Sequence, residues 1–373
     1  MEKVECVVIG AGAVGLAIAR ELARRGREVV IIERNSLIGS ETSSRNNEVI
    51  HAGFLYPPDS LRGRLCHPGA ESLINYCQDH NVDVAARGKL LLALDDKEIN
   101  LLHSFIELGQ ACGVDDLTFL RPEKVAEIEP DINCLAALYS PSTAIVDSHA
   151  LMLAYLGDAE EAGAVLALNT NVVSGSVDNA GGVLNVVGED GEEYQLGWSC
   201  LINAAGLGAK NIADKIQGTR SNDPPDIFYA KGSFFSLTGR TPFEHIIVPL
   251  GETLAGGGAF TLDNGGRGKF GPDLEWVDTI DYTVDPNKAA QFAAAISKYW
   301  KDIDVKRLQP DYSGIRPRSW GQNDPPGEWI IETPEAHGIP GLINLFGIET
   351  PGLTASLAIS KYVADALMLE RTL

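Results

Sequence analysis

The sequence predicts an α/β protein with two domains, one built on a parallel sheet and the other on a mainly antiparallel sheet. Three observations support this prediction. The chain opens with an apolar run, a glycine turn, a helical pattern and a second apolar run, which together form a βαβ unit. Residues 227–283 instead show short apolar runs separated by Gly and Pro. The length of 373 residues, of which 45% are hydrophobic, is ordinary for about two globular domains.

The first strand ends at Ile9 and enters a turn with the spacing Gly10-x-Gly12-x-x-Gly15. Glycine at these positions allows a tight turn, close approach of a pyrophosphate and close packing of the next helix on the strand. The free N–H groups of that helix then face the phosphates. Glu33 ends the second strand, where its carboxylate can accept hydrogen bonds from ribose hydroxyls and repel a 2'-phosphate. The opening therefore predicts a Rossmann-like FAD/NAD(P)-binding domain and disfavours NADP.

The later elements follow from apolar periodicity and from capping residues. A polar loop over residues 35–47 is rich in hydroxyls and amides, and composition leaves open whether it binds a ligand or is simply solvated. We expect helices at 65–78, 95–112, 148–163 and 285–300, strands at 89–94, 165–168, 171–177, 183–187 and 342–346, and a last helix with Thr350 as N-cap and Pro351 as its first residue.

These elements predict a discontinuous division of the chain into two domains. The cofactor domain would comprise residues 1–86, 145–222 and 318–373. The substrate or cap domain would comprise residues 87–144 and 223–317, with its sheet mainly antiparallel.

Composition argues against several classes of partner. A net charge of −21 disfavours nucleic acid and anionic membrane surfaces as partners. No apolar run is long enough to span a bilayer, and the strand that begins at Val4 leaves no room for a signal peptide. We therefore expect a protein of the cytoplasm, or one peripheral to the inner membrane. The six scattered cysteines predict reduced thiols, and the histidine spacing predicts no metal site.

Several further segments occur in a recognisable order. They are Ser43-Ser-Arg-Asn46, Asn203-Ala-Ala-Gly206, Lys231-Gly232, Gly271-Pro-Asp273, Gly314-Ile-Arg-Pro317 and the closing turn at Gly347. Together with the opening turn they resemble the FAD-dependent D-amino-acid oxidase superfamily over essentially the whole chain. Within it, residues 43–53 with Tyr56, and residues 350–359, are most similar to the L-2-hydroxyglutarate dehydrogenase branch. Ala259 departs from that branch, which usually has a histidine there, and the change would affect substrate recognition more than catalysis.

The resemblance implies FAD as the cofactor. The binding is expected to be noncovalent, because the family's flavin-linked cysteine is absent, and a histidyl link through His51 is the alternative. A helix start after Gly347 would stabilise the negative charge of reduced flavin. The implied cofactor-binding residues are Gly10, Gly12, Ala13, Val14, Gly15, Glu33, Arg34, Ser43, Ser44, Arg45, Asn46, Asn47, Val172, Ala204, Ala205, Gly206, Gly347, Thr350, Pro351, Gly352, Leu353 and Thr354.

The resemblance also implies oxidation of a small L-2-hydroxy acid, with L-2-hydroxyglutarate as the best single substrate. Hydride would pass from the α carbon to flavin N5. Arg316 would bind the substrate carboxylate, although a surface ion pair is the alternative role for it. His51 would be the base, with a structural role as its alternative. Tyr56 and Lys231 are weaker pocket candidates.

Two other functions are compatible with the same segments. One is an amine or amino-acid oxidase of the same fold, acting on glycine, sarcosine or a D-amino acid. The other is a non-catalytic flavoprotein subunit of an electron-transfer complex. For an enzyme, the expected partners are a small-molecule carboxylate and an electron acceptor, which is oxygen, a quinone or a protein.

Overall fold

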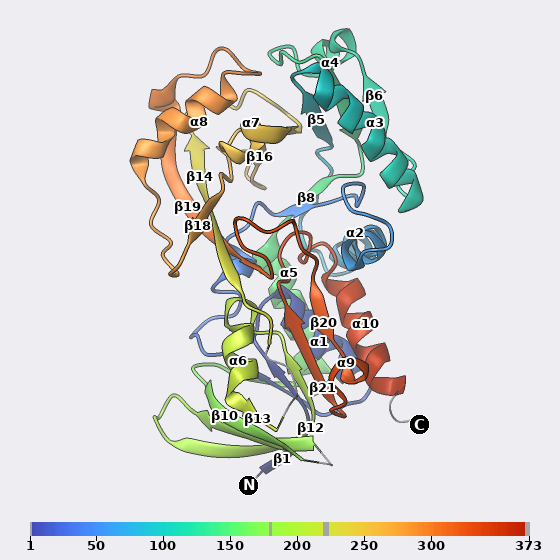
Figure 1. Ribbon diagram of the computed structural model, residues 1–373, viewed down its shortest axis with the longest axis vertical. Coiled ribbons are helices and arrows are strands. Elements are labelled where there is room, and N and C mark those ends of the chain that lie inside the picture. Colours follow the sequence, from blue (N-terminus) through green and yellow to red (C-terminus); the bar gives the residue numbers. More distant parts are fainter. Residues whose placement is uncertain (1, 179–180, 219–223, 370–373) are drawn as a thin grey trace. The chain divides into compact units, whose positions relative to one another are not determined.

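The computed structural model describes residues 2–178, 181–218 and 224–369, and the chain divides into two compact units (Figure 1). Unit 1 comprises Met1–Ser44, Ser148–Phe228 and Arg316–Leu373, and unit 2 comprises Arg45–Asp147 and Tyr229–Ile315. Residues 45–86, which we expected in the cofactor domain, thus cluster with unit 2. The predicted boundary between residues 222 and 223 lies outside the described residues. The assignment of one domain to the cofactor and one to the substrate stays a prediction.

Unit 1 is built on a mixed sheet with a parallel centre, as the sequence predicts. β1 (Glu2–Ile9) pairs in parallel with β2 (Val29–Ile32) on one side and with β12 (Glu193–Asn203) on the other. β9 (Val165–Ala167) and β21 (Leu342–Phe346) extend this parallel part. The remaining strands are β10 (Asn171–Asp178), β11 (Gly181–Val187), β13 (Ile216–Gln217) and β20 (Ile330–Glu332).

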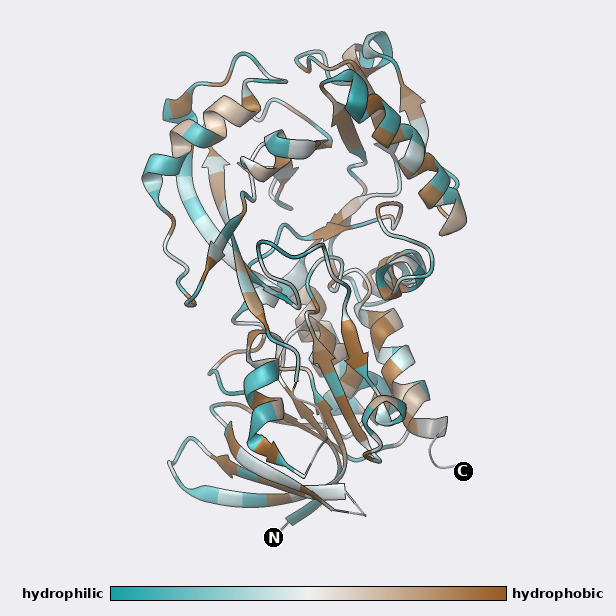
Figure 2. Cartoon of the chain, in the orientation of Figure 1, coloured by the Kyte–Doolittle hydropathy of each residue, from teal (hydrophilic) through white to brown (hydrophobic). Residues whose placement is uncertain are grey.

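Burial explains why these segments form the sheet of unit 1. β21 is buried along its whole length, which fits its mainly apolar sequence and its largely brown colour in Figure 2. α1 (Ala13–Arg24) buries Leu16, Ile18 and Leu22, and it packs against α5 (Ser148–Glu161) and α10 (Ser356–Leu369). The other helical segments are η1 (Thr42–Ser44), η2 (Gly206–Gly208), α6 (Ala209–Lys215) and α9 (Pro334–His337).

Unit 2 contains the mainly antiparallel sheet that the sequence predicts. Its path runs β18 (Glu275–Val277), β14 (Phe228–Leu237), β17 (Gly268–Phe270), β16 (Phe260–Leu262), β15 (Ile246–Pro249), β5 (Lys89–Ala93), β7 (Ala136–Ser140) and β6 (Thr118–Leu120), with β19 (Leu308–Arg318) paired to β14. β15 and β5 pair in parallel. A small sheet joins β3 (Val49–Ile50), β8 (Ala144–Val146) and β4 (Val84–Ala85).

Both faces of this larger sheet are covered. The helical segments of unit 2 are α2 (Leu61–Asp79), α3 (Asp96–Ala111), α4 (Pro122–Ile128), α7 (Gly251–Ala255), η3 (Pro286–Lys288), α8 (Ala289–Ile296) and η4 (Val305–Arg307). In β5, Leu90 and Leu92 join a cluster with Phe292 of α8, whereas Leu91 joins a cluster with Leu102 of α3. Alternate residues of the strand therefore face opposite layers.

Two predicted helices need correction. The segment predicted as one helix over residues 285–300 is η3 followed by α8, which ends at Ile296. The last helix begins at Ser356, so the prediction of Thr350 as N-cap and Pro351 as first residue was wrong. The physical reason is a tight turn before the helix, in which the Gly352 N–H donates to the Glu349 carbonyl. In the described part of the chain, no helix has the length and apolar character needed to cross a membrane.

Candidate functional site

Close contacts explain why the turn between β1 and α1 in unit 1 needs glycine at three positions. Gly10 has a φ of +104°, and a Cβ there would lie 2.6 Å from the Ala204 carbonyl oxygen. A Cβ on Gly15 would lie 2.0 Å from the Gly10 carbonyl oxygen, and a Cβ on Gly12 would lie 2.9 Å from Ser43 Oγ. Each predicted glycine therefore has its own steric reason, and the turn presents backbone rather than side chains at the start of α1.

Two predicted side chains converge on this turn from later parts of the sequence. Ser43 Oγ accepts a hydrogen bond of 3.0 Å from the Ala13 N–H, at the first residue of α1. The buried Glu33 carboxylate accepts from the Ala11 N–H at 2.9 Å and from the Asn35 N–H at 2.8 Å. A carboxylate has about four acceptor positions, so Glu33 can hold the turn and still accept from a ribose hydroxyl.

The other residues predicted for the nucleotide half surround the same turn or the strands next to it. The Ala204 N–H donates to the Ile9 carbonyl, and Gly206, the first residue of η2, has a φ of +53°. Arg34 forms an ion pair with Glu41 and lies near Gly208. Val14 lies in the first turn of α1, and Ala205 follows Ala204 directly. The Ser44 N–H donates to the carbonyls of Gly39 and Glu41. Val172 is buried beside a β-bulge of β10.

The closing turn of unit 1 lies beside the predicted substrate arginine. The buried Glu349 carboxylate lies 3.7 Å from Arg316 Nε and 3.3 Å from Arg318 Nε. Arg316 and Arg318 are two residues apart on β19, so their side chains share one face of the strand. The sequence did not single out Glu349 or Arg318. The signal was present, since Glu349 is the one acid between the apolar β21 and α10.

Three further cofactor candidates, residues 45–47, belong to unit 2. The Arg45 guanidinium carbon lies 4.1 Å from the Tyr282 ring centroid. Arg45 Nε is buried and has no hydrogen-bond partner among the described residues. Asn46 Oδ1 accepts from the Glu48 N–H, and the carbonyl of Asn46 accepts from the Tyr312 hydroxyl at 2.5 Å. Asn47 is half-buried. The orphaned guanidinium nitrogen is what an anionic or strongly polar ligand would satisfy.

His51 and Tyr56 lie on one segment that the helices of unit 2 hold in place. Cys66 Sγ of α2 donates to the His51 carbonyl at 3.5 Å, and Cys112 Sγ donates to the Tyr56 carbonyl at 3.6 Å. His67 Nδ1 lies 3.2 Å from the Ala52 carbonyl oxygen. His51 and Tyr56 are both half-buried. These contacts fix the backbone on which both candidate side chains stand.

Buried lysines of unit 2 include one residue that the sequence singled out and one that it missed. Lys231 Nζ donates to the Thr283 carbonyl at 2.7 Å and lies 3.5 Å from Asp281 Oδ2. Lys269 Nζ lies 3.0 Å from the Tyr312 hydroxyl, and burial lowers the pKa of this lysine. The Lys231 ammonium is thus already bonded to oxygens of its own unit.

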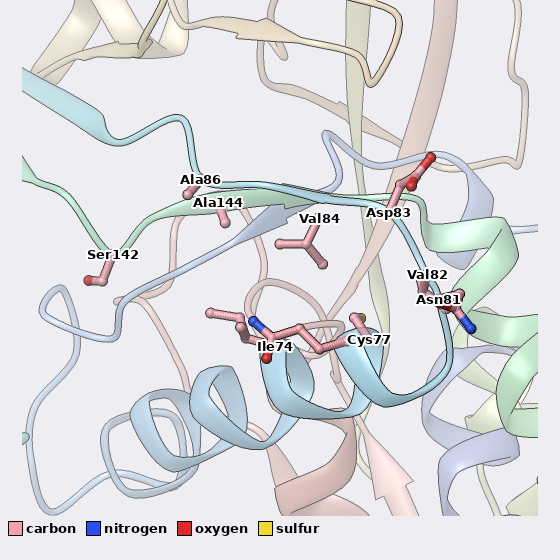
Figure 3. Close-up of a pocket in the computed structure, with 10 residues that line it drawn as sticks. Ile74, Cys77, Asn81, Val82, Asp83, Val84, Ala86, Ser142 and Ala144 are labelled. Carbon is pink, nitrogen blue, oxygen red and sulfur yellow. The ribbon is translucent and has the colours of Figure 1, made fainter.

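Unit 2 also contains a pocket of about 440 Å³ between α2 and the small sheet (Figure 3). Ile74 and Cys77 come from α2, Val84 from β4 and Ala144 from β8, and Asp83 is a further lining residue. None of the predicted site residues lines this pocket.

The residues present fit FAD. The glycine turn leaves no room for side chains where a pyrophosphate would approach, and Ser43 and Glu33 are fixed beside it. Within unit 1, the N–H groups at the start of α1 match the anionic oxygens of a dinucleotide, and the Glu33 carboxylate matches a ribose hydroxyl.

Comparison with known proteins agrees with this geometry. Residues 5–366 match the family model described as FAD dependent oxidoreductase (DAO). The chain is 38% identical to the mitochondrial L-2-hydroxyglutarate dehydrogenase of Arabidopsis thaliana, over 98% of this chain and 84% of that protein. It is 31% identical to a glycerol 3-phosphate dehydrogenase of Caloramator mitchellensis, over 97% and 73%.

A solved structure shows the same fold. The dithionite-reduced L-α-glycerophosphate oxidase from Mycoplasma pneumoniae, with FAD bound, aligns with a TM-score of 0.87 at 21% identity, covering 99% of this chain and 95% of that one. The mixed α/β fold and the FAD cofactor predicted from the sequence are confirmed. The chain belongs to the DAO family of FAD-dependent oxidoreductases.

Proposed function

We propose that this FAD-dependent oxidoreductase oxidises L-2-hydroxyglutarate to 2-oxoglutarate. The observation that carries the proposal is the position of Arg316, which stands beside the closing turn with 29% of its side chain exposed. A guanidinium has five N–H donors in a planar fork that matches a carboxylate, which suits Arg316 to bind a substrate carboxylate. The identity of 38% to a protein named L-2-hydroxyglutarate dehydrogenase supports the choice of substrate.

The reaction removes two electrons and two protons from the substrate. When bound, FAD supplies the two-electron acceptor that takes the hydride from C2. Arg316 would hold the C1 carboxylate and so align C2 for the transfer. His51 would take the proton from the C2 hydroxyl, which becomes the carbonyl of the product. Tyr56 and Lys231 would line the pocket, and Glu349 would orient Arg316.

Turnover with a panel of substrates tests the proposal. Purified holoenzyme should convert L-2-hydroxyglutarate to 2-oxoglutarate, identified by mass, with a dye, oxygen and a quinone analogue compared as acceptors. The D enantiomer, glycine, sarcosine and D-alanine should give little turnover. Faster turnover of any of these than of L-2-hydroxyglutarate would contradict the proposal.

L-glycerol 3-phosphate is a second candidate substrate, favoured by the 31% identity to a protein named glycerol 3-phosphate dehydrogenase. Its phosphate could also bind a guanidinium. It belongs in the same panel, because oxidation of its C2 hydroxyl needs the same hydride and proton transfers.

Replacing His51 by asparagine should lower kcat by about 10²-fold, the usual contribution of a positioned base, and change KM little. The backbone contact from Cys66 does not depend on the His51 side chain, so the segment should stay in place. Steady-state kinetics of His51→Asn check this. The matched control is His103→Asn, an exposed histidine stacked on Phe119 of the same unit. Equal kcat in the two variants would rule out a catalytic role for His51.

A further inference from the structure

Lys89 is a buried cation that lies against an aromatic ring. It opens β5 and is 3% exposed. Its Nζ lies 4.4 Å from the centroid of the Phe54 ring. Among the described residues, no carboxylate lies within ion-pair distance of this ammonium, and the one neighbouring titratable group that raises its pKa is Cys66. Burial raises the pKa of Cys66 itself to about 12, so this thiol supplies no negative charge at neutral pH.

Three other lysines of unit 2 have oxygen acceptors close to their ammonium groups. Lys231 Nζ has the Thr283 carbonyl at 2.7 Å, and Lys269 Nζ has the Tyr312 hydroxyl at 3.0 Å. Lys288 Nζ lies 2.8 Å from Asp273 Oδ2 and 2.5 Å from Glu275 Oε2. Each of these ammonium groups has oxygen acceptors, which offset the cost of removing a charge from water. Lys89 differs from these three lysines, because no oxygen acceptor for its ammonium is found among the described residues.

An ammonium in such a place is costly. Burial lowers the pKa of Lys89 to about 8, so the side chain is still mostly charged at pH 7. The ring of Phe54 offsets part of the desolvation cost through a cation–π interaction. An anion that binds beside Lys89 would offset the rest, because the interaction of opposite charges is strong where water is excluded.

The surroundings of Lys89 connect it to the candidate site. Lys89 and Leu91 are alternate residues of β5, and Leu91 lies in the cluster that contains Phe54. Cys66, which interacts with Lys89, also donates to the His51 carbonyl. Phe54 itself lies between His51 and Tyr56 in the sequence. The ammonium thus lies against the segment that carries both candidate side chains of unit 2.

We propose that Lys89 binds the second carboxylate of a dicarboxylic 2-hydroxy acid and so makes the enzyme prefer dicarboxylates to monocarboxylates. The inference rests on the proposed function. A chain with a net charge of −21 repels a dianion in general, so each desolvated carboxylate needs a cation nearby. Lys89 supplies the second one.

The test compares Lys89→Met with the wild-type holoenzyme on L-2-hydroxyglutarate and on L-2-hydroxybutyrate, which lacks the second carboxylate. We expect kcat/KM for the dicarboxylate to fall about 10²-fold, the range for truncating one partner of a buried charge pair, and kcat/KM for the monocarboxylate to stay within about threefold. Titration of the flavin absorbance with glutarate, which cannot be oxidised, should show a matching rise in Kd. Lys89→Arg should recover part of the preference.

Thermal unfolding separates this role from a structural one. Lys89→Met should have a higher Tm than the wild type, because a buried charge without a partner is replaced by an apolar side chain. The control Lys288→Met removes an ammonium with two carboxylate partners, so it should lower Tm and leave the dicarboxylate preference unchanged.

Each remaining outcome overturns the inference. An unchanged preference and an unchanged glutarate Kd in Lys89→Met, with the wild type active on L-2-hydroxyglutarate, would refute the role of Lys89 and leave the proposed function standing. A wild type that reacts with neither hydroxy acid would refute both.

Discussion

Replacing Gly15 by alanine is expected to abolish FAD binding. The new Cβ would lie 2.0 Å from the Gly10 carbonyl oxygen, a backbone atom that cannot move without opening the turn between β1 and α1. That turn presents the N–H groups at the start of α1, so displacing it removes the phosphate site. We expect a colourless protein with a Kd for FAD raised at least about 10²-fold, measured by fluorescence quenching of added FAD.

Two further variants test whether the loss of FAD binding comes from the turn itself. Gly12→Ala places its Cβ 2.9 Å from Ser43 Oγ, a milder clash, so it should fold yet bind FAD weakly. Gly157→Ala is the control, because Gly157 lies within α5 with nothing within 4 Å of the added carbon. It should stabilise the protein by about 1 kcal/mol through helix propensity and leave FAD binding unchanged. A yellow Gly12→Ala protein with wild-type affinity would show that the turn does not hold the cofactor.

Replacing Arg316 by methionine is expected to lower kcat/KM for L-2-hydroxyglutarate by about 10³-fold, since truncating one partner of a buried charge pair costs about 2–5 kcal/mol. Most of the effect should appear in KM, with FAD content unchanged. The fold should survive, because the Glu349 carboxylate keeps Arg318 at 3.3 Å as its partner. Steady-state kinetics with L-2-hydroxyglutarate measure kcat and KM. Inhibition by the product, 2-oxoglutarate, measures the affinity for a bound carboxylate independently of turnover.

Arg307→Met is the control for that experiment. Arg307 donates to the carbonyls of Thr238 and Arg240 and lies over the Trp300 ring, remote in sequence from the closing turn. It should change stability more than kinetics. If Arg316→Met kept the wild-type KM, Arg316 would be a structural partner of Glu349 rather than a substrate ligand.

Local sequence signals predicted most of the fold. β1, the glycine turn and α1 were predictable because apolar burial, steric demand and helix capping all act within a few residues there. The antiparallel sheet of unit 2 was predictable from short runs between glycines, although not its parallel pair of β15 and β5, whose strands are about 150 residues apart. The start of α10 was mispredicted because a turn closed by Gly352 resembles a capped helix in sequence.

The candidate site was less accessible to sequence reasoning, because its contacts join residues far apart in the chain. The pairing of Glu349 with Arg318 depends on the closing turn meeting β19. Lys89 reads in sequence as a lysine before an apolar strand, and only burial shows that its ammonium lacks an oxygen partner among the described residues. Whether a buried charge has a partner depends on residues that are distant in the sequence, so a local sequence pattern cannot predict it.

Anaerobic reduction of the bound flavin tests the central claim most directly. One equivalent of L-2-hydroxyglutarate per FAD, mixed with holoenzyme without oxygen, should bleach the visible flavin bands and release one equivalent of 2-oxoglutarate. A flavin that stays oxidised with this hydroxy acid while glycerol 3-phosphate, glycine or sarcosine bleaches it would contradict the account.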